Sequence, residues 1–157
     1  MEAHFAVFDT AIGSCGIVWR RQQILGTYLP ERDIPTLRGR IGREHPGSAE
    51  GAPPPSVQRV ADGIVRLMAG EACDLSGADL DMSNVPAFNR RVYALALNIP
   101  PGRTLSYGEI ADMIGAPGSA RAVGRALGRN PFPIVVPCHR VLAAGGRSGG
   151  FSAEGGV

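Results

Sequence analysis

The segment from Asn130 to Val141 constrains the fold of this chain more than any other. It reads Asn-Pro-Phe-Pro-Ile-Val-Val-Pro-Cys-His-Arg-Val. Proline has a fixed φ and no backbone N–H, so this segment can form neither a regular helix nor a central strand. Ile134–Val136 could supply at most a short strand or extended piece. We therefore expect Cys138 to stand at the end of a rigid extended run.

The residues that follow Cys138 are those expected beside a reactive thiol. His139 and Arg140 could lower its pKa and raise the fraction of thiolate, the nucleophilic form. Consecutive residues of an extended chain point to opposite faces, so we expect His139 to act through a water molecule rather than directly. Two plainer interpretations stay open: His139 as a core histidine, and Asn130 as a brace for a turn.

Composition indicates a globular protein with an aliphatic core. Of the 157 residues, 44% are hydrophobic, 6% aromatic and 19% charged, so disorder is not expected. The N-terminus shows no leader, and no apolar run is long enough to cross a bilayer, so we expect no membrane contact. Cys15, Cys73 and Cys138 suit neither a disulfide framework nor a zinc site, with Cys15 and Cys73 interpreted as small buried hydrophobes. We expect free thiols, a cytoplasmic location, and no metal or cofactor.

The first half alternates short apolar runs with turn residues, which predicts an antiparallel meander followed by one helix. The predicted strands are Phe5–Phe8, Gly16–Trp19 and Ile24–Leu29. Residues 40–56, rich in Gly, Pro and charge, are predicted to form an exposed loop. Val57–Ala69 has helical periodicity and ends before Gly70, and Leu75–Met82 is predicted as a returning strand or a loop.

The second half is predicted to be helical. The helices expected are Val85–Ile99 with Ser83 or Asn84 as cap, a short one beginning at Tyr107, and Ala120–Leu127 capped by Ser119. Ser106 and Glu109 have the spacing of a capping box, and Gly115–Gly118 is typical of a tight turn. Helix, turn and helix outline a helix-turn-helix, although two packed helices of any small domain would read the same way.

Basic residues gather in this second half. The net charge of +2 is too small by itself to indicate a nucleic-acid partner. Between residues 103 and 147, however, arginines face few acidic residues. The arginines are Arg103, Arg121, Arg125, Arg129, Arg140 and Arg147, and the acidic residues are Glu109 and Asp112. A helix of small residues and arginines could approach a phosphate backbone closely.

Three groups of these residues resemble the O6-alkylguanine-DNA alkyltransferase family: Arg121–Gly124, Asn130-Pro131 and Pro137–Val141. The resemblance runs from about Phe88, through residues 107–111, to residues 150–152. It implies an α+β fold. Residues 1–82 would form a ribonuclease H-like α/β domain with antiparallel strands. Residues 83–157 would form a helical, winged-helix-like (helix-turn-helix) alkyltransferase domain that binds DNA.

The resemblance also implies a reaction: single-turnover transfer of an alkyl group from O6 of guanine in DNA to the protein. Activity on O4-alkylthymine stays open. Cys138 would accept the alkyl group, and His139 would draw off its proton through water. Asn130 would brace the loop, and Tyr107 would help to protonate the departing guanine. The partner would be double-stranded DNA, bound by a monomer in the minor groove with the damaged base flipped out.

The remaining site residues implied by the resemblance contact DNA or the base. Arg121 would enter the duplex and fill the gap left by the extruded nucleotide. The other DNA-binding candidates are Ala122, Gly124, Arg125, Ala126 and Arg140, the small ones lining the minor groove. Main-chain groups around Val141 and Ser152 would hold the guanine edge, while Phe151 would wall the pocket.

One part of the family pattern has no counterpart here. The glutamate that orients the family's catalytic histidine lies on a helix after the Ser152 region, whereas this sequence ends at Val157 and Glu154 stands too early to replace it. Loss of that carboxylate should reduce thiolate formation. We expect a shortened form of a functional parent. Two other interpretations are a non-catalytic module that binds damaged DNA and a helix-turn-helix regulator with an inert or redox-sensing thiol.

Overall fold

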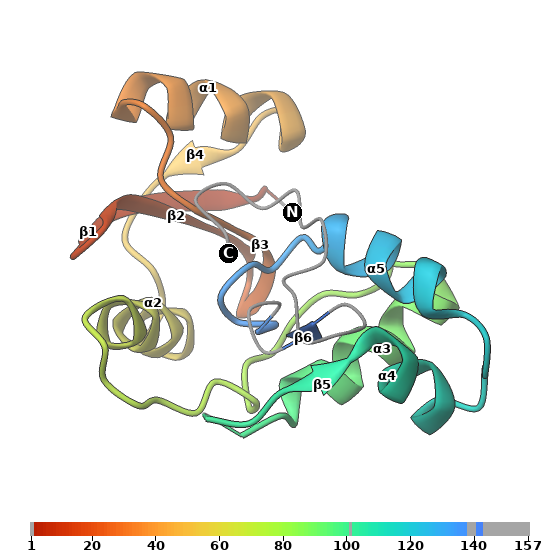
Figure 1. The fold of residues 1–157 in the computed structure, drawn as a ribbon. Helices are drawn as coiled ribbons and strands as arrows, with labels where there is room; N and C mark the ends of the chain where they lie inside the picture. The colour runs from red at the N-terminus through yellow and green to blue at the C-terminus, as the bar shows by residue number, and fades with distance from the viewer. Residues whose placement is uncertain (1, 101, 138–140, 143–157) are drawn as a thin grey trace. The chain divides into compact units, whose positions relative to one another are not determined.

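The computed structural model describes residues 2–100, 102–137 and 141–142 (Figure 1). The chain divides into two compact units, Met1–Asp81 and Met82–Val157. Each unit has its own set of secondary-structure elements, and each is taken in turn below.

The first unit is built on a four-stranded sheet with the strand order β3-β2-β1-β4. Its elements are β1 (His4–Thr10), β2 (Gly13–Arg20), β3 (Gln23–Tyr28), α1 (Ile34–Glu44), β4 (Ala49–Glu50) and α2 (Pro55–Met68). The first three strands form the predicted antiparallel meander, which is thereby confirmed. The short β4 runs parallel to β1.

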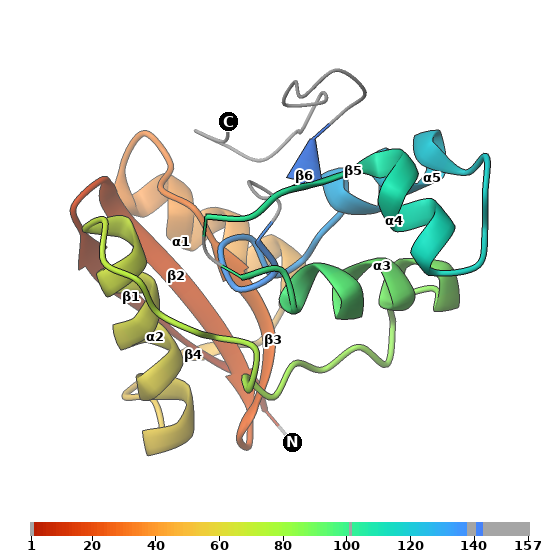
Figure 2. The same ribbon diagram turned by 60° about the horizontal axis from the view of Figure 1, so that its bottom comes forward.

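Helices cover both faces of this sheet. Every residue of β2 from Cys15 to Trp19 is buried, as expected for a strand with both faces covered. The helix α1 lies on one face and α2 on the other (Figure 1, Figure 2). The buried cluster on the α1 side consists of Phe5, Val18, Tyr28, Leu37 and Ile41. At Gly16 an added Cβ would lie 3.0 Å from Cδ1 of Ile41, so glycine permits this close approach of helix to sheet.

The prediction that residues 40–56 form one exposed loop is wrong, because α1 extends to Glu44 and α2 begins at Pro55. Asp33 caps the helix, and its Oδ1 accepts a hydrogen bond from the backbone N of Thr36 at 2.7 Å. Leu37 and Ile41, four residues apart, are fully buried. Burial of this pair outweighs the low helix propensity of the glycines around it.

The remaining elements of the first unit lie close to their predicted positions. The helix α2 starts at Pro55, in the first turn where proline is favoured, and ends at Met68. The segment 75–82 is a loop with a single bridge to β3. There the backbone N of Ile24 donates to the carbonyl of Asp79, and the N of Asp81 donates to the carbonyl of Ile24, both at 2.8 Å.

The second unit is mainly helical. Its elements are α3 (Ala87–Leu97), β5 (Leu105–Ser106), α4 (Tyr107–Met113), α5 (Ala120–Gly128) and β6 (Val141–Leu142). The predicted capping box is confirmed: Ser106 Oγ accepts from the N of Glu109 at 3.0 Å, and Glu109 Oε1 accepts from the N of Ser106 at 2.9 Å. Gly115 and Gly118 adopt φ of 77° and 83° in the turn between α4 and α5, a conformation that favours glycine.

One predicted cap is wrong, and a second is confirmed in its position only. The helix α3 is shorter than expected, and Pro86 rather than Ser83 or Asn84 occupies its N-cap position. Ser119 does occupy the N-cap position of α5, but its side chain makes no capping hydrogen bond. At Ser119 the backbone has φ −100° and ψ 27°, outside the extended conformation in which an N-cap side chain usually reaches the first turn.

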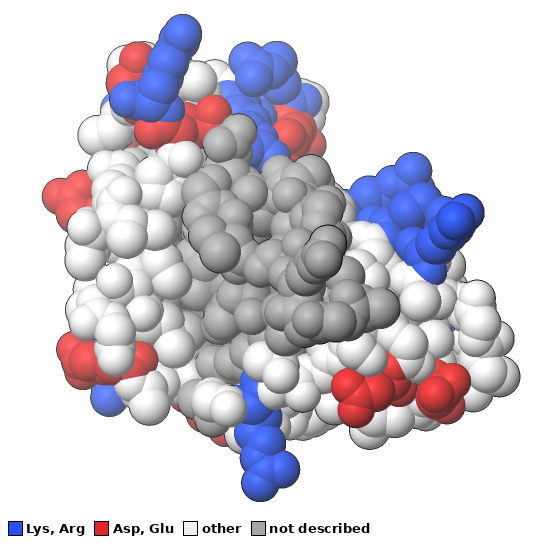
Figure 3. Space-filling model, in the orientation of Figure 1, with Lys and Arg blue, Asp and Glu red and all other residues white. Residues whose placement is uncertain are grey.

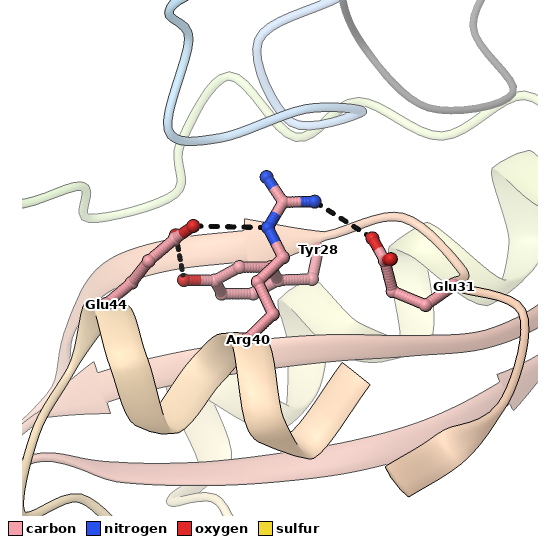
Figure 4. Close-up of polar contacts among 4 residues, drawn as sticks. All are labelled: Tyr28, Glu31, Arg40 and Glu44. Carbon is pink, nitrogen blue, oxygen red and sulfur yellow. Dashed lines mark hydrogen bonds and ion pairs between the residues drawn. The ribbon is translucent and has the colours of Figure 1, made fainter. Parts of the chain in front are cut away.

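A polar cluster ties α1 to the end of β3 (Figure 4). Tyr28 Oη donates to Glu44 Oε1 at 2.6 Å, and Arg40 Nε donates to Glu44 Oε2 at 3.1 Å. Arg40 also reaches Glu31 at 3.0 Å. Burial, reinforced by the Glu44 carboxylate, raises the pKa of Tyr28. Burial alone would raise the pKa of Glu44, but the hydrogen bonds from Tyr28 and Arg40 hold it below its ordinary value.

This cluster predicts a pH-dependent contribution to stability. Because the pKa of Glu44 is depressed by folding, its contribution is present above the unfolded-state pKa of about 4.3 and is lost as pH falls through the folded-state pKa. Glu44→Gln should lower the free energy of unfolding by about 1 kcal/mol at pH 7, a modest value because half of the side chain is in solvent. The difference from wild type should shrink near pH 3.

Urea unfolding followed by the fluorescence of Trp19 measures this difference, because Trp19 is the only tryptophan and is buried in this unit. Glu71→Gln is the control, since Glu71 makes an exposed ion pair with Arg66 and should have little effect. A Glu44→Gln difference of equal size at both pH values would contradict the assignment.

Candidate active site

The helix α5 has a buried face and an arginine-bearing face. Val123, Ala126 and Leu127 are buried, whereas Arg121 and Arg125 are exposed on the opposite side. Figure 3 shows the basic side chains gathered over α5 and acidic ones over α4. Both arginines predicted to bind DNA on this helix therefore lie on a surface that a polyanion could reach.

The small residues of α5 differ in their positions. Ala122 is half-buried, but Ala126 is 1% exposed and packs into the unit, so the expectation that it lines a groove does not fit the structure. Gly124 lies against the ring of Tyr107, where an added Cβ would be 3.0 Å from Cε2. Its lack of a side chain lets α5 pack closely on Tyr107.

Tyr107 stands where α4 meets a short pair of strands. It is the first residue of α4 and is 9% exposed. The strand before it, β5, pairs in parallel with β6, with Leu105 opposite Val141 and Ser106 opposite Leu142. The backbone of Val141 is thus fixed beside the residues that lead into Tyr107.

A buried tyrosine that sequence reasoning missed also holds α5. Tyr93 on α3 is 1% exposed, and its Oη donates to the carbonyl of Ala126 at 2.5 Å. A tyrosine within an apolar helix pattern looks like an ordinary core residue, so no sequence pattern indicates this hydrogen bond. The contact fixes the last turn of α5 relative to α3.

Asn130 closes the turn that follows α5. Its Oδ1 accepts from the backbone N of Phe132 at 2.8 Å, and its Nδ2 donates to the carbonyl of Val136 at 3.3 Å. The N of Val136 in turn donates to the carbonyl of Phe132 at 2.8 Å. One side chain thus bonds to both ends of the segment that precedes Pro137 and Cys138.

This segment is a turn, and the predicted extended run is wrong. Ile134 has a φ of 76°, in the left-handed region, which is unfavourable for a β-branched residue. Phe132 and Val136 are fully buried, and Ile134 is 8% exposed. Burial and the Asn130 hydrogen bonds outweigh the extended preference of isoleucine and valine. A non-glycine residue in this conformation is the kind of local strain that often marks functional sites.

Several predicted site residues lie outside the described part of the chain: Cys138, His139, Arg140, Phe151 and Ser152. Val141 is described through its backbone pairing. Within the described ranges, no group of three or more His, Cys, Asp or Glu side chains could hold a metal ion. No helix in the same ranges is long and apolar enough to span a membrane. Cys15 is buried, as predicted, and burial raises the pKa of its thiol, while Cys73 is half-buried.

Comparison with known proteins identifies similar sequences. Residues 87–157 match the family model described as 6-O-methylguanine DNA methyltransferase, DNA binding domain. The methylated-DNA–protein-cysteine methyltransferase of Mycobacterium tuberculosis H37Rv is 38% identical over 154 residues, covering 94% of this chain and 83% of that protein. The protein of the same name from Methanothermobacter thermautotrophicus is 39% identical over 110 residues, covering 70% and 60%.

Solved structures with the same fold include one from Mycobacterium tuberculosis and one from a hyperthermophilic archaeon. The crystal structure of Mycobacterium tuberculosis OGT in complex with DNA has a TM-score of 0.76 and 34% identity, covering 94% of this chain and 83% of that one. The O6-methylguanine-DNA methyltransferase of Pyrococcus kodakaraensis KOD1 has a TM-score of 0.71 and 28% identity, covering 94% and 90%. The mixed α+β fold of this chain is therefore that of these proteins.

The contact between Gly124 and Tyr107 predicts opposite effects of alanine at two helical glycines. Gly108→Ala, on exposed α4 surface with ordinary contact distances, should stabilise the protein by up to about 1 kcal/mol through helix propensity. Gly124→Ala should instead destabilise it by about 1 kcal/mol or more, because the ring of Tyr107 must move. Urea unfolding followed by circular dichroism measures both. Equal stabilisation by the two changes would show that Tyr107 does not pack on α5 as described.

Proposed function

Because this chain belongs to the methylated-DNA–protein-cysteine methyltransferase family, we propose that it repairs DNA by moving an alkyl group from O6 of guanine to its own Cys138. The observation that carries this proposal is the 38% identity to a methylated-DNA–protein-cysteine methyltransferase over 94% of the chain. The enzyme activity is that of a methylated-DNA–[protein]-cysteine S-methyltransferase (EC 2.1.1.63). A helix with an exposed arginine face and a fixed turn before Cys138 supply the parts that such a reaction needs.

The transfer is a simple substitution. The thiolate sulfur attacks the alkyl carbon, a carbon–sulfur bond forms, and the carbon–O6 bond breaks with its electron pair going to the guanine. A proton then neutralises the departing base. Alignment, a nucleophile and a proton donor account for the step, and no oxidant is consumed. The product is a thioether, which is not readily cleaved, so each molecule would act once.

Residue roles follow from the family resemblance, and contacts of the described residues support two of them. We assign Cys138 as the acceptor, with His139 removing its proton through water. The hydrogen bonds of Asn130 to Phe132 and Val136 support its role in bracing the turn that precedes Cys138. The position of Tyr107 beside the β5–β6 pair supports its role as proton donor to the leaving guanine.

The DNA-binding mode is proposed on the same basis. An alkyl carbon on O6 lies inside the base stack, so the nucleotide must be flipped out at a cost of a few kcal/mol. Arg121 would enter the duplex from the minor groove and fill the gap. Arg125 and Arg140 would contact phosphates, with Ala122 and Gly124 allowing close approach. The guanine would be held by main-chain groups of Val141 and Ser152 and walled by Phe151.

The finer description of the protein is also a proposal. We assign residues 1–82 to a ribonuclease H-like domain, supported by the antiparallel meander with helices on both faces. Residues 83–157 would be a winged-helix-like domain, supported by the succession of α4, turn and α5. We expect a monomer in the cytoplasm, an expectation that rests on the scattered free cysteines and on the stoichiometric reaction.

The alternatives of a non-catalytic damage-binding module and a helix-turn-helix regulator are not favoured. The relatives that cover most of this chain carry the name of a methyltransferase. The sequence retains a cysteine within the Pro137–Val141 motif, which neither alternative requires.

Label transfer from DNA tests the proposal. A duplex carrying radiolabelled O6-methylguanine should give up to one methyl group per protein molecule, and peptide mapping should place it on Cys138. Cys138→Ala should bind the duplex but accept no label, whereas Cys73→Ala should accept it normally. Label on another residue, or many turnovers per molecule, would refute the mechanism.

A further inference from the structure

The arginine face of α5 extends beyond the residues that resemble the family. Arg121 belongs to the Arg121–Gly124 motif, but Arg125 and Arg129 follow at intervals of four residues, and Arg129 has been given no role above. Residues four apart on a helix lie on one side and rise by about 6 Å per step. All three are exposed, opposite the buried Val123, Ala126 and Leu127. We call these three side chains the arginine row.

Among the described residues, no ion pair joins a member of the arginine row to an acidic side chain. In the first unit, Arg38, Arg40 and Arg66 each lie within 4.0 Å of a glutamate, whereas four arginines resemble the row in having no described ion pair: Arg20, Arg21, Arg43 and Arg59. The nearby helix α4 carries Glu109, which is used in the capping box with Ser106, and Asp112, which no described ion pair joins to the row. The row is therefore a line of cations without described counter-charges.

Helix stability does not explain the whole row. Like charges four residues apart destabilise a helix by about 0.2–0.5 kcal/mol per pair. Arg121 lies in the first turn, where the helix dipole disfavours a cation. Arg125 and Arg129 lie near the C-terminal end, where the dipole favours them, so a stabilising role for these two is the competing explanation. An experiment must separate that role from binding.

We propose that Arg125 and Arg129 continue the contact begun by Arg121 along the phosphates of one DNA strand, giving the protein affinity for any duplex, damaged or not. This inference rests on the proposed function, since it takes DNA as the partner. Guanidinium groups pair well with phosphate oxygens, and each such contact releases condensed counterions. The arginines of α5 would then have different roles. Arg121 would act at the extruded base, whereas Arg125 and Arg129 would provide sequence-independent affinity for the duplex.

The arginine row ends next to the turn that precedes Cys138. Arg129 occupies the C-cap of α5 and directly precedes Asn130, whose side chain closes the turn before Cys138. A phosphate contact at Arg129 would hold the DNA strand at the end of α5 from which that turn departs. The same row would thus place the duplex in register with the segment that carries the nucleophile.

Salt dependence of binding tests this proposal. Fluorescence anisotropy with an undamaged duplex gives the slope of log affinity against log salt for wild type, Arg125→Gln, Arg129→Gln and the double variant. Each single change should reduce the slope by about one unit, and the double change by about two. Between 50 and 200 mM salt, one lost contact corresponds to a roughly threefold smaller fall in affinity. Arg59→Gln, on exposed α2 surface, is the matched control and should leave the slope unchanged.

The competing explanation predicts a different pattern. If Arg125 and Arg129 only stabilise α5, the variants will unfold at lower urea concentration than wild type. Their slope of log affinity against log salt, measured on folded protein, will then equal that of wild type, which overturns the proposal. Arg129→Lys keeps the charge and should keep the slope. Label transfer by the wild-type protein is measured in the same series. If the label is transferred but the slopes of the variants equal that of wild type, the proposed phosphate contacts are rejected and the proposed function stands. If the slopes fall but no label is transferred, the proposed function is rejected and the phosphate contacts stand.

Discussion

The candidate site depends on two hydrogen bonds of the Asn130 side chain, which accepts one from the backbone N of Phe132 and donates one to the carbonyl of Val136, at the two ends of one short turn. The turn includes Ile134 in a left-handed conformation, which costs about 1–3 kcal/mol. Each hydrogen bond contributes about 1 kcal/mol net, so the pair alone barely offsets that cost. Burial of Phe132 and Val136, worth about 1.5–3 kcal/mol each, makes the turn stable. The hydrogen bonds of Asn130 therefore determine which conformation the turn adopts, and burial of the apolar side chains supplies most of its stability.

The same turn connects the two chemical tasks of the protein. It begins where α5 ends, and α5 carries the exposed arginines. The orientation of α5 is fixed from the interior by the hydrogen bond of Tyr93 to Ala126 and by the contact of Gly124 with Tyr107. In the binding mode proposed above, α5 would contact DNA on its arginine-bearing face, and the same helix leads directly into the turn before Cys138. This continuity explains why a small helical unit could both bind a duplex and present a nucleophile to it.

The sequence predicted those features that depend on neighbouring residues. The meander follows from alternating apolar runs and turn residues, and the capping box follows from the spacing of Ser106 and Glu109. Features that depend on packing were missed. The helix α1 is stabilised by burial of Leu37 and Ile41, although Gly39 and Gly42 weaken its local signal. The turn at Ile134 opposes the preference of its own residues, and the partner of the Tyr93 hydroxyl lies 33 residues along the chain. The role of Cys138 came from its motif rather than from geometry.

The most direct test of this account is the rate of alkyl transfer by Asn130→Ala at saturating duplex, compared with its affinity for undamaged DNA. If the Asn130 hydrogen bonds position the segment that carries Cys138, the rate constant should fall by roughly tenfold or more, corresponding to about 1.4 kcal/mol of lost alignment. The affinity should stay within about twofold of wild type, because the arginines of α5 remain in place. A variant that transfers the alkyl group at the wild-type rate would contradict the account.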